Sequence, residues 1–177
     1  MIKNKILKLR KLIKINNIDG YIIPKNDAYF SEYSSPDRLK ILTNFSGSAG
    51  FAIILKKENY LFVDGRYTIQ AQIQSGRNFK IIEVPKFSTK YILKKIKKRL
   101  LLGFDPQLFT NLSLKRKFSK DFDLLPIHEN LIDKIYKDKS KKITSSFYNL
   151  ENKISGESVN LKINRLIRIM KIKKIDN

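Results

Sequence analysis

The chain has 177 residues, no cysteine and a formal net charge of +21 at neutral pH. The lack of cysteine excludes disulfide bonds and thiolate chemistry, and no apolar run approaches the ~20 residues that a membrane-spanning helix needs. A hydrophobic content of 42% is typical of a globular protein rather than a disordered one.

Apolar residues in the amino-terminal third recur first at helical and then at strand spacing. Two apolar runs around Lys57-Glu58-Asn59 predict a β-hairpin. Pro24 ends the first strand, because proline lacks the N–H group that a strand donates. The predicted elements are an amphipathic helix over 3–17, a buried strand over 21–23, a short helix over 37–42, and hairpin strands over 51–55 and 60–63.

Helices and strands alternate through the next third of the chain. Ser88 is the predicted N-cap of one helix, because a serine hydroxyl accepts from the free N–H groups of the first turn. The predicted elements are helices over 67–75, 89–99 and 112–118, and strands over 79–84, 100–104 and 122–127. This alternation, together with the hairpin, predicts an α/β fold with a mixed β-sheet flanked by helices.

The tail repeats the opening helix. Residues 138–154 are polar and lysine-rich, which is typical of a linker. Residues 161–177 align on 4–20 without a gap, and the shared positions include Ile6/Ile163 and Leu9/Leu166. Either two amphipathic helices resemble each other by chance, or the helix opens a second copy of the same architecture.

Two short motifs are the candidates for function. The turn Gly47-Ser48-Ala49-Gly50 contains only small residues, so backbone can approach backbone, and glycine tolerates positive φ. Asp64-Gly65-Arg66-Tyr67 follows a predicted strand, where side chains are presented to a ligand. We therefore assign structural turns to Gly47, Gly50, Asp64 and Gly65. Arg66 either binds a carboxylate or carbonyl of a ligand, or pairs with Asp64 to hold the turn.

Two other polar residues are poor candidates for chemistry. Ser48 has no neighbouring histidine to activate its hydroxyl, and its flanking residues are not Gly-x-Ser-x-Gly. His128 is the only histidine, and zinc needs three or four ligands. We therefore expect no catalytic residue and no metal ligand in this chain.

The positive charge has two interpretations. Lysine and arginine neutralise phosphates and release counterions, so a small basic nucleic-acid-binding module is the alternative function. Lysine, isoleucine and asparagine are abundant together, however, and A/T-rich codons encode all three, which favours compositional drift. The basic residues are also scattered over many elements, so we expect neither a nucleic-acid nor a membrane partner. Because no signal-peptide core follows the basic start, we expect a cytoplasmic protein.

Three segments in order resemble one family. These are the stretch 27–50, the Asp64–Tyr67 turn, and the segment 126–136 with its Asn130-Leu131-Ile132-Asp133 sequence. Together they resemble the amino-terminal, creatinase-type domain of Xaa-Pro aminopeptidases (aminopeptidase P). On this resemblance, residues 1–137 are a complete first domain, 138–154 a linker, and 155–177 the opening helix of a truncated second, related domain.

The resemblance implies a function for the whole enzyme and a smaller role for this chain. The enzyme would remove an N-terminal residue that precedes proline, using two divalent ions (manganese) held by a catalytic domain outside these residues. In similar enzymes the arginine matching Arg66 contacts the bound substrate. Glu32, Tyr33 and Tyr67 are candidates for the rim of the substrate channel. For the loop of Asp27, Ser31, Glu32 and Tyr33, the alternative is a loop that hydrogen-bonds only to its own backbone.

The same resemblance implies partners. The peptide substrate would carry proline at its second position, and the domain would contribute to contacts in a homo-oligomer. A further alternative is a free-standing interaction domain that dimerises with an intact enzyme.

Overall fold

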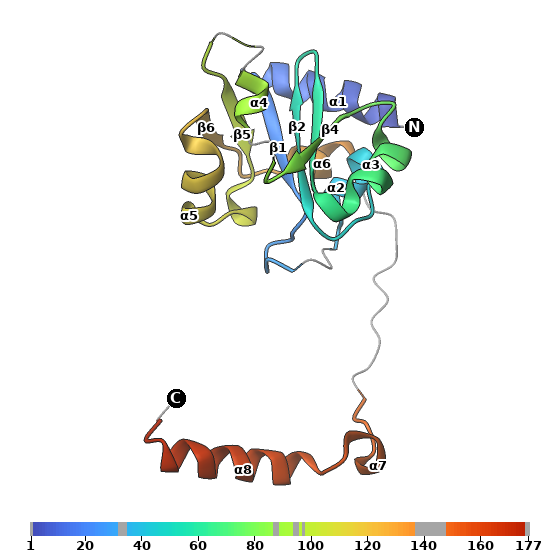
Figure 1. Ribbon diagram of the computed structural model, residues 1–177. Coiled ribbons are helices and arrows are strands. Elements are labelled where there is room, and N and C mark those ends of the chain that lie inside the picture. The colour runs from blue at the N-terminus through green and yellow to red at the C-terminus, as the bar shows by residue number, and fades with distance from the viewer. Residues whose placement is uncertain are drawn as a thin grey trace. The chain divides into compact units, whose positions relative to one another are not determined.

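The computed structural model describes residues 2–31, 35–86, 89–93, 96, 98–136 and 148–175. The chain divides into two compact units, Met1–Lys139 and Ser140–Asn177, and each is considered by itself (Figure 1). No helix of the described residues is long and apolar enough to cross a bilayer.

The first unit is built on a six-stranded sheet with the order β4-β3-β2-β1-β5-β6 (Figure 1). Strand β2 is antiparallel to both of its neighbours, and the other neighbouring pairs are parallel. All strands except β2 therefore end at the same edge of the sheet, here called the carboxyl edge. The strands are β1 Gly20–Pro24, β2 Gly50–Leu55, β3 Asn59–Asp64, β4 Lys80–Val84, β5 Leu101–Phe104 and β6 Asp123–Pro126.

Helices cover both faces of the sheet, which confirms the predicted fold class. A π-helical turn, η3, continues α5, and short 3-10 turns, η1 and η2, follow β3 and β5. The bounds are α1 Ile2–Ile15, α2 Arg38–Thr43, η1 Gly65–Tyr67, α3 Thr68–Ser75, α4 Lys90–Leu93, η2 Pro106–Leu108, α5 Asn111–Leu114, η3 Lys115–Ser119 and α6 Leu131–Ile135.

The core has two layers because strand side chains alternate between the faces of the sheet. Tyr21 and Ile23 pack with the buried residues of α1, α2, α3 and α6. Ile22 points to the other face, where it packs with Ile92 of α4 and Phe118 of η3. The apolar alternation within the strands thus assigns each helix group to one face.

Polar contacts hold α6, the last helix of the first unit, in place. Asn130 caps α6 by accepting a hydrogen bond from the N–H of Ile132 at 2.9 Å, and its side-chain amide donates to buried Asp105 at 2.8 Å. Arg38 of α2 donates two hydrogen bonds to Asp133 of α6, at 2.9 and 2.7 Å. The Asn130–Asp133 segment therefore connects α6 to α2 and to the loop after β5 through hydrogen bonds.

One predicted helix is too long. The helix expected over 89–99 is α4, which ends at Leu93, and described residues up to Arg99 lie outside it. The Arg99 side chain instead donates to Asp123 at 2.7 Å and to the carbonyl oxygens of Ser119 and Phe122. At Arg99, hydrogen bonds to residues distant in sequence thus take the place of helical contacts. The predicted cap Ser88 lies outside the described residues, and helix α6 was not predicted from the sequence.

The second unit contains α7 Asn152–Ser155 and α8 Val159–Ile172. Ser158 caps α8 by accepting from the N–H of Leu161 at 3.3 Å, and Arg165 donates to Glu157. The helix expected in the tail is therefore present. The short helix α7 overlaps the stretch predicted as a linker, most of which lies outside the described residues.

The helix α8 repeats the pattern of α1 but not its burial. Leu9 of α1 is 0% exposed, and its equivalent Leu166 is 57% exposed. Ile6 is likewise buried, and its equivalent Ile163 is 48% exposed. The same apolar stripe is thus core in one unit and surface in the other.

The equivalent leucines give a matched test of this difference. We expect Leu9→Ala to lower the free energy of unfolding by about 2–5 kcal/mol, because it leaves a cavity in the core. Leu166→Ala removes the same atoms from an exposed site, so we expect a change below about 0.5 kcal/mol. Urea denaturation followed by circular dichroism measures both, and equal losses would contradict the burial described for α8.

Candidate functional site

The predicted motifs meet at the carboxyl edge of the sheet. The Asp64–Tyr67 turn follows β3 there, and the turn 43–50 enters β2 beside it, because β2 is antiparallel to β3. In sheets with parallel strands, ligands bind in the crevice outside the carboxyl ends of the strands. This edge is therefore the candidate functional site.

The turn 43–50 has a backbone that only certain residues allow. Asn44 ends α2 in the left-handed conformation at φ 66°, which asparagine tolerates, and its N–H donates to the carbonyl of Lys40. A Cβ atom at Gly47 would lie 2.3 Å from the ring of Phe45. Gly50 has φ 157°, and a Cβ atom there would lie 2.7 Å from the carbonyl oxygen of Phe62. The two glycines thus permit close packing of this turn on its own aromatic residue and on β3.

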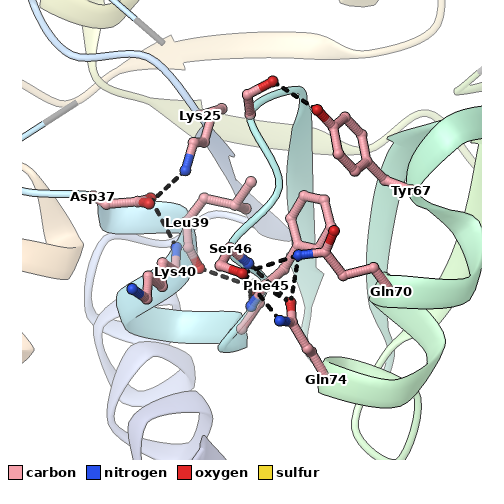
Figure 2. A network of polar contacts seen from close by, with 11 residues as sticks. Lys25, Asp37, Leu39, Lys40, Phe45, Ser46, Tyr67, Gln70 and Gln74 are labelled. Atoms are coloured by element: carbon pink, nitrogen blue, oxygen red, sulfur yellow. Dashed lines mark hydrogen bonds and ion pairs between the residues drawn. The ribbon is translucent and has the colours of Figure 1, made fainter. Parts of the chain in front are cut away.

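Side chains of α3 hold the turn in place (Figure 2). Gln74 accepts from the N–H of Ser46 at 3.0 Å and donates to its hydroxyl at 3.0 Å, and Gln70 donates to the same hydroxyl at 2.9 Å. The hydroxyls of Tyr67 and Ser48 form a further hydrogen bond of 2.9 Å. The two glutamines were not predicted as site residues, although their spacing of four residues places them on one face of a helix.

Asp64 and Arg66 form the ion pair that the sequence left open. One oxygen of Asp64 accepts from the backbone N–H of Arg66 at 3.0 Å and from its Nε at 2.9 Å. The guanidinium also lies 5.5 Å from the centre of the Tyr67 ring. The Arg66 side chain is nevertheless 73% exposed. Its charge is thus oriented by the turn while remaining accessible to a ligand.

The ion pair with Arg66 changes the pKa of the Asp64 carboxyl group. The hydrogen bond from the Arg66 side chain, followed by the one from its backbone N–H, lowers the pKa of Asp64 below its ordinary value. Gly65 lies between the two residues, and a Cβ atom there would lie 3.2 Å from a carboxylate oxygen of Glu83. Asp64 therefore stays ionised at neutral pH and keeps Arg66 in one orientation.

The loop after β1 closes on itself. One oxygen of Asp27 accepts from the N–H groups of Tyr29 at 2.9 Å and of Ser31 at 3.0 Å. This is the self-bonded arrangement that the sequence analysis left as one alternative. The predicted rim residues Glu32 and Tyr33 lie outside the described residues.

The described residues include Ser48 and His128, the two polar side chains that the sequence raised as candidates for chemistry. They contain no group of three or more histidine, cysteine, aspartate or glutamate side chains that could hold a metal ion. His128 is exposed, and the Ser48 hydroxyl bonds to a tyrosine rather than to a base. The two divalent ions implied by the resemblance therefore do not fit this part of the chain.

Known proteins resemble nearly the whole chain. The sequence profile of the Creatinase/Prolidase N-terminal domain matches residues 5–135. A protein of Laccaria bicolor named Probable Xaa-Pro aminopeptidase P is 32% identical over 97% of this chain. Xaa-Pro aminopeptidase 1 of Dictyostelium discoideum is 32% identical over 99% of it. The chain spans only 28% and 31% of the lengths of these two relatives.

Solved structures show the same fold. The X-prolyl aminopeptidase of Caenorhabditis elegans, described as a cytosolic enzyme with a di-nuclear active site, has a TM-score of 0.73 and 26% identity. The match covers 98% of this chain and 32% of the worm protein. The N-terminal domain of a cytoplasmic peptidase from Mycobacterium tuberculosis has a TM-score of 0.59 at 19% identity, which supports the fold alone.

The ion pair predicts a shift in the titration of Asp64. In Arg66→Ala we expect the Asp64 midpoint to rise toward its ordinary value of 3.8, because both the charge and the side-chain donor are lost. Since the folded-state pKa is the lowered one, the stabilisation is present above the ordinary pKa and lost as pH falls through the lowered one. Carboxyl NMR titration measures the midpoint.

Glu129 is the internal control for this titration. Its pKa is lowered by the hydrogen bond and charge of Lys134, so its midpoint should be the same in both proteins. An unchanged Asp64 midpoint would mean that the pair does not form in solution.

Gly47 and Gly65 give a matched steric test. We expect Gly47→Ala to lower the free energy of unfolding by about 1–3 kcal/mol, because its Cβ would meet the Phe45 and Tyr67 rings. Gly65→Ala meets only the movable end of Glu83, so we expect a change within about 0.5 kcal/mol. Thermal denaturation measures both, and a neutral Gly47→Ala would refute the assigned close packing.

Proposed function

The chain belongs to the Creatinase/Prolidase N-terminal domain family, and we propose from this that it is the non-catalytic amino-terminal part of an Xaa-Pro aminopeptidase. The relatives named Xaa-Pro aminopeptidase support this assignment, because they match almost the entire chain. The whole enzyme would remove an N-terminal residue that precedes proline. Peptides with proline at the second position are then its substrates.

The observation that carries the proposal is the presentation of Arg66. A short 3-10 turn, an aspartate and a packed tyrosine orient the guanidinium at the carboxyl edge, and most of the side chain remains exposed. A guanidinium forms paired hydrogen bonds with carboxylates and carbonyls, which a bound peptide supplies. Arg66 is therefore the substrate-binding residue of this domain, and Tyr67, Glu32 and Tyr33 form the channel rim.

We propose that the catalytic chemistry belongs to a part of the enzyme outside these residues. The worm relative described as having a di-nuclear active site supports two divalent ions there, and we assign them as manganese. Ions of this kind activate water as a nucleophile. The worm relative is also described as cytosolic, which supports a cytoplasmic location for this protein.

The domain arrangement follows the same proposal. Residues 1–137 are the first domain, 138–154 a linker, and 155–177 the opening helix of a second, related domain. The support is the shared pattern of α1 and α8, since Ile6 and Leu9 are buried in α1 whereas their apolar equivalents Ile163 and Leu166 are exposed in α8. A sheet belonging to the second domain would bury them. Contacts within a homo-oligomer complete the proposed role.

Substitution at the Arg66 position of a full-length relative tests the substrate role. We expect Arg66→Ala there to lower kcat/KM for an Xaa-Pro peptide about tenfold or more, because a charge-assisted hydrogen bond to the substrate is lost. Steady-state kinetics on a purified enzyme measure the effect, and circular dichroism checks the fold.

Two further variants sharpen the result. Arg66→Lys keeps the charge but not the planar donor pair, so we expect an intermediate loss. Arg77 is another exposed arginine of the domain, just beyond α3, and alanine at its position should leave the kinetics unchanged. Normal kinetics for Arg66→Ala would remove the substrate role from this residue.

A further inference from the structure

A separate cavity of about 490 Å³ opens at the carboxyl edge beside the Arg66 turn. Its apolar lining comes from the start of β2 and the end of β4 and consists of Ala49, Gly50, Phe51, Val84 and Pro85. This volume falls within the range of small-molecule sites, which are mostly apolar with a few convergent polar groups. The cavity thus has the size and the lining of a ligand site.

Four basic side chains converge on this cavity. Lys90 comes from α4, and Arg116, Lys117 and Lys120 come from η3 and the residue after it. Within the described part of the chain, none of the four forms a salt bridge. Like charges held together repel one another, and a bound anion relieves that repulsion.

The two acids of the cavity are already engaged. Asp121 accepts from the hydroxyl of Thr89 at 2.9 Å, and Asp64 accepts from Arg66. The segments 85–99 and 110–120, which carry the four cations, contain no aspartate or glutamate, and the Glu83 carboxylate lies on the Gly65 side of the turn. The positive charge here therefore differs from basic residues scattered over the chain, because two acid-free segments meet at one cavity.

The helical turn η3, which supplies Arg116 and Lys117 and precedes Lys120, is fixed in rotation. Phe118 of η3 is 1% exposed. Its ring packs edge-on against the rings of Phe51 and Phe109, with ring centres 5.4 Å and 6.0 Å apart. With Phe118 buried, its neighbours Arg116 and Lys117 are turned to the surface. A π-helical turn inserts one extra residue into a helix, and such turns are frequent at functional sites.

We propose that this cavity binds a small phosphorylated molecule with a planar apolar group, of the nucleotide class. Arginine binds phosphate oxygens in pairs, and lysine adds point charges. The apolar lining fits the planar group, and the remaining acceptor atoms of Asp121 suit a ligand hydroxyl. The proposal does not depend on the role of Arg66 in peptide binding.

Calorimetric titration of the full 177-residue chain with ADP tests the proposal. We expect saturable binding with one site per chain, weakened by added salt as screening requires. In Arg116→Gln/Lys120→Gln we expect the Kd to rise about tenfold or more, because two charged phosphate contacts are lost. Absence of ADP binding by the unchanged chain would overturn the proposal.

A charge-matched variant separates the cavity from general positive charge. Lys8→Gln/Lys11→Gln removes the same charge from exposed positions of α1, which covers the opposite face of the sheet. We expect this variant to bind ADP with unchanged Kd, and an equal loss in both variants would refute a specific site. Thermal denaturation checks that both variants are folded.

Two other probes identify the source of the phosphate group. Inorganic phosphate should bind more weakly than ADP, because it lacks the planar group that the apolar lining would contact. A short single-stranded RNA should compete no better than ADP. RNA binding without ADP binding would replace the proposal by a nucleic-acid interface.

Discussion

A Cβ atom at Gly50 would lie 2.7 Å from the carbonyl oxygen of Phe62, so a larger residue there would push β2 away from β3. The same turn is pressed onto the Phe45 ring at Gly47. Because Tyr67 packs against that ring, the turn also sets the position of the Asp64–Tyr67 motif. The placement of Arg66 thus depends on close backbone packing several residues away from it.

The carboxyl edge brings two kinds of binding group together. Asp64 holds Arg66 on one side and lines the cationic cavity on the other. An unpaired carboxylate would repel an anion in that cavity, and its bond to the Arg66 guanidinium offsets part of that charge. The peptide-binding and phosphate-binding proposals therefore share one acid, although different cations serve each of them.

Local patterns predicted the sheet and most helices, because apolar spacing in each segment agrees with its place in the fold. The β-hairpin and α1 follow directly from such spacing. The end of α4 does not, since Arg99 bonds to Asp123, which is distant in sequence. The cap of α6 likewise depends on Asp105. These features arise only when the chain has folded.

The candidate site likewise combines contacts between adjacent residues with contacts between residues distant in sequence. Single motifs indicated Asp64 and Arg66, because adjacent residues make their contacts, whereas Gln70 and Gln74 gain meaning only where α3 meets the turn at Ser46. The grouping of Lys90 with Arg116, Lys117 and Lys120 at one cavity likewise follows from the fold and not from the pattern of either segment.

Helices α1 and α8 show most clearly that a sequence pattern does not by itself determine burial. They share an apolar stripe, yet Leu9 is buried and Leu166 exposed. A short isolated helix is only marginally stable in water, and packing of its apolar face supplies most of its stability. The sequence of a helix therefore specifies which face needs a partner, whereas the fold around it determines whether that face is covered.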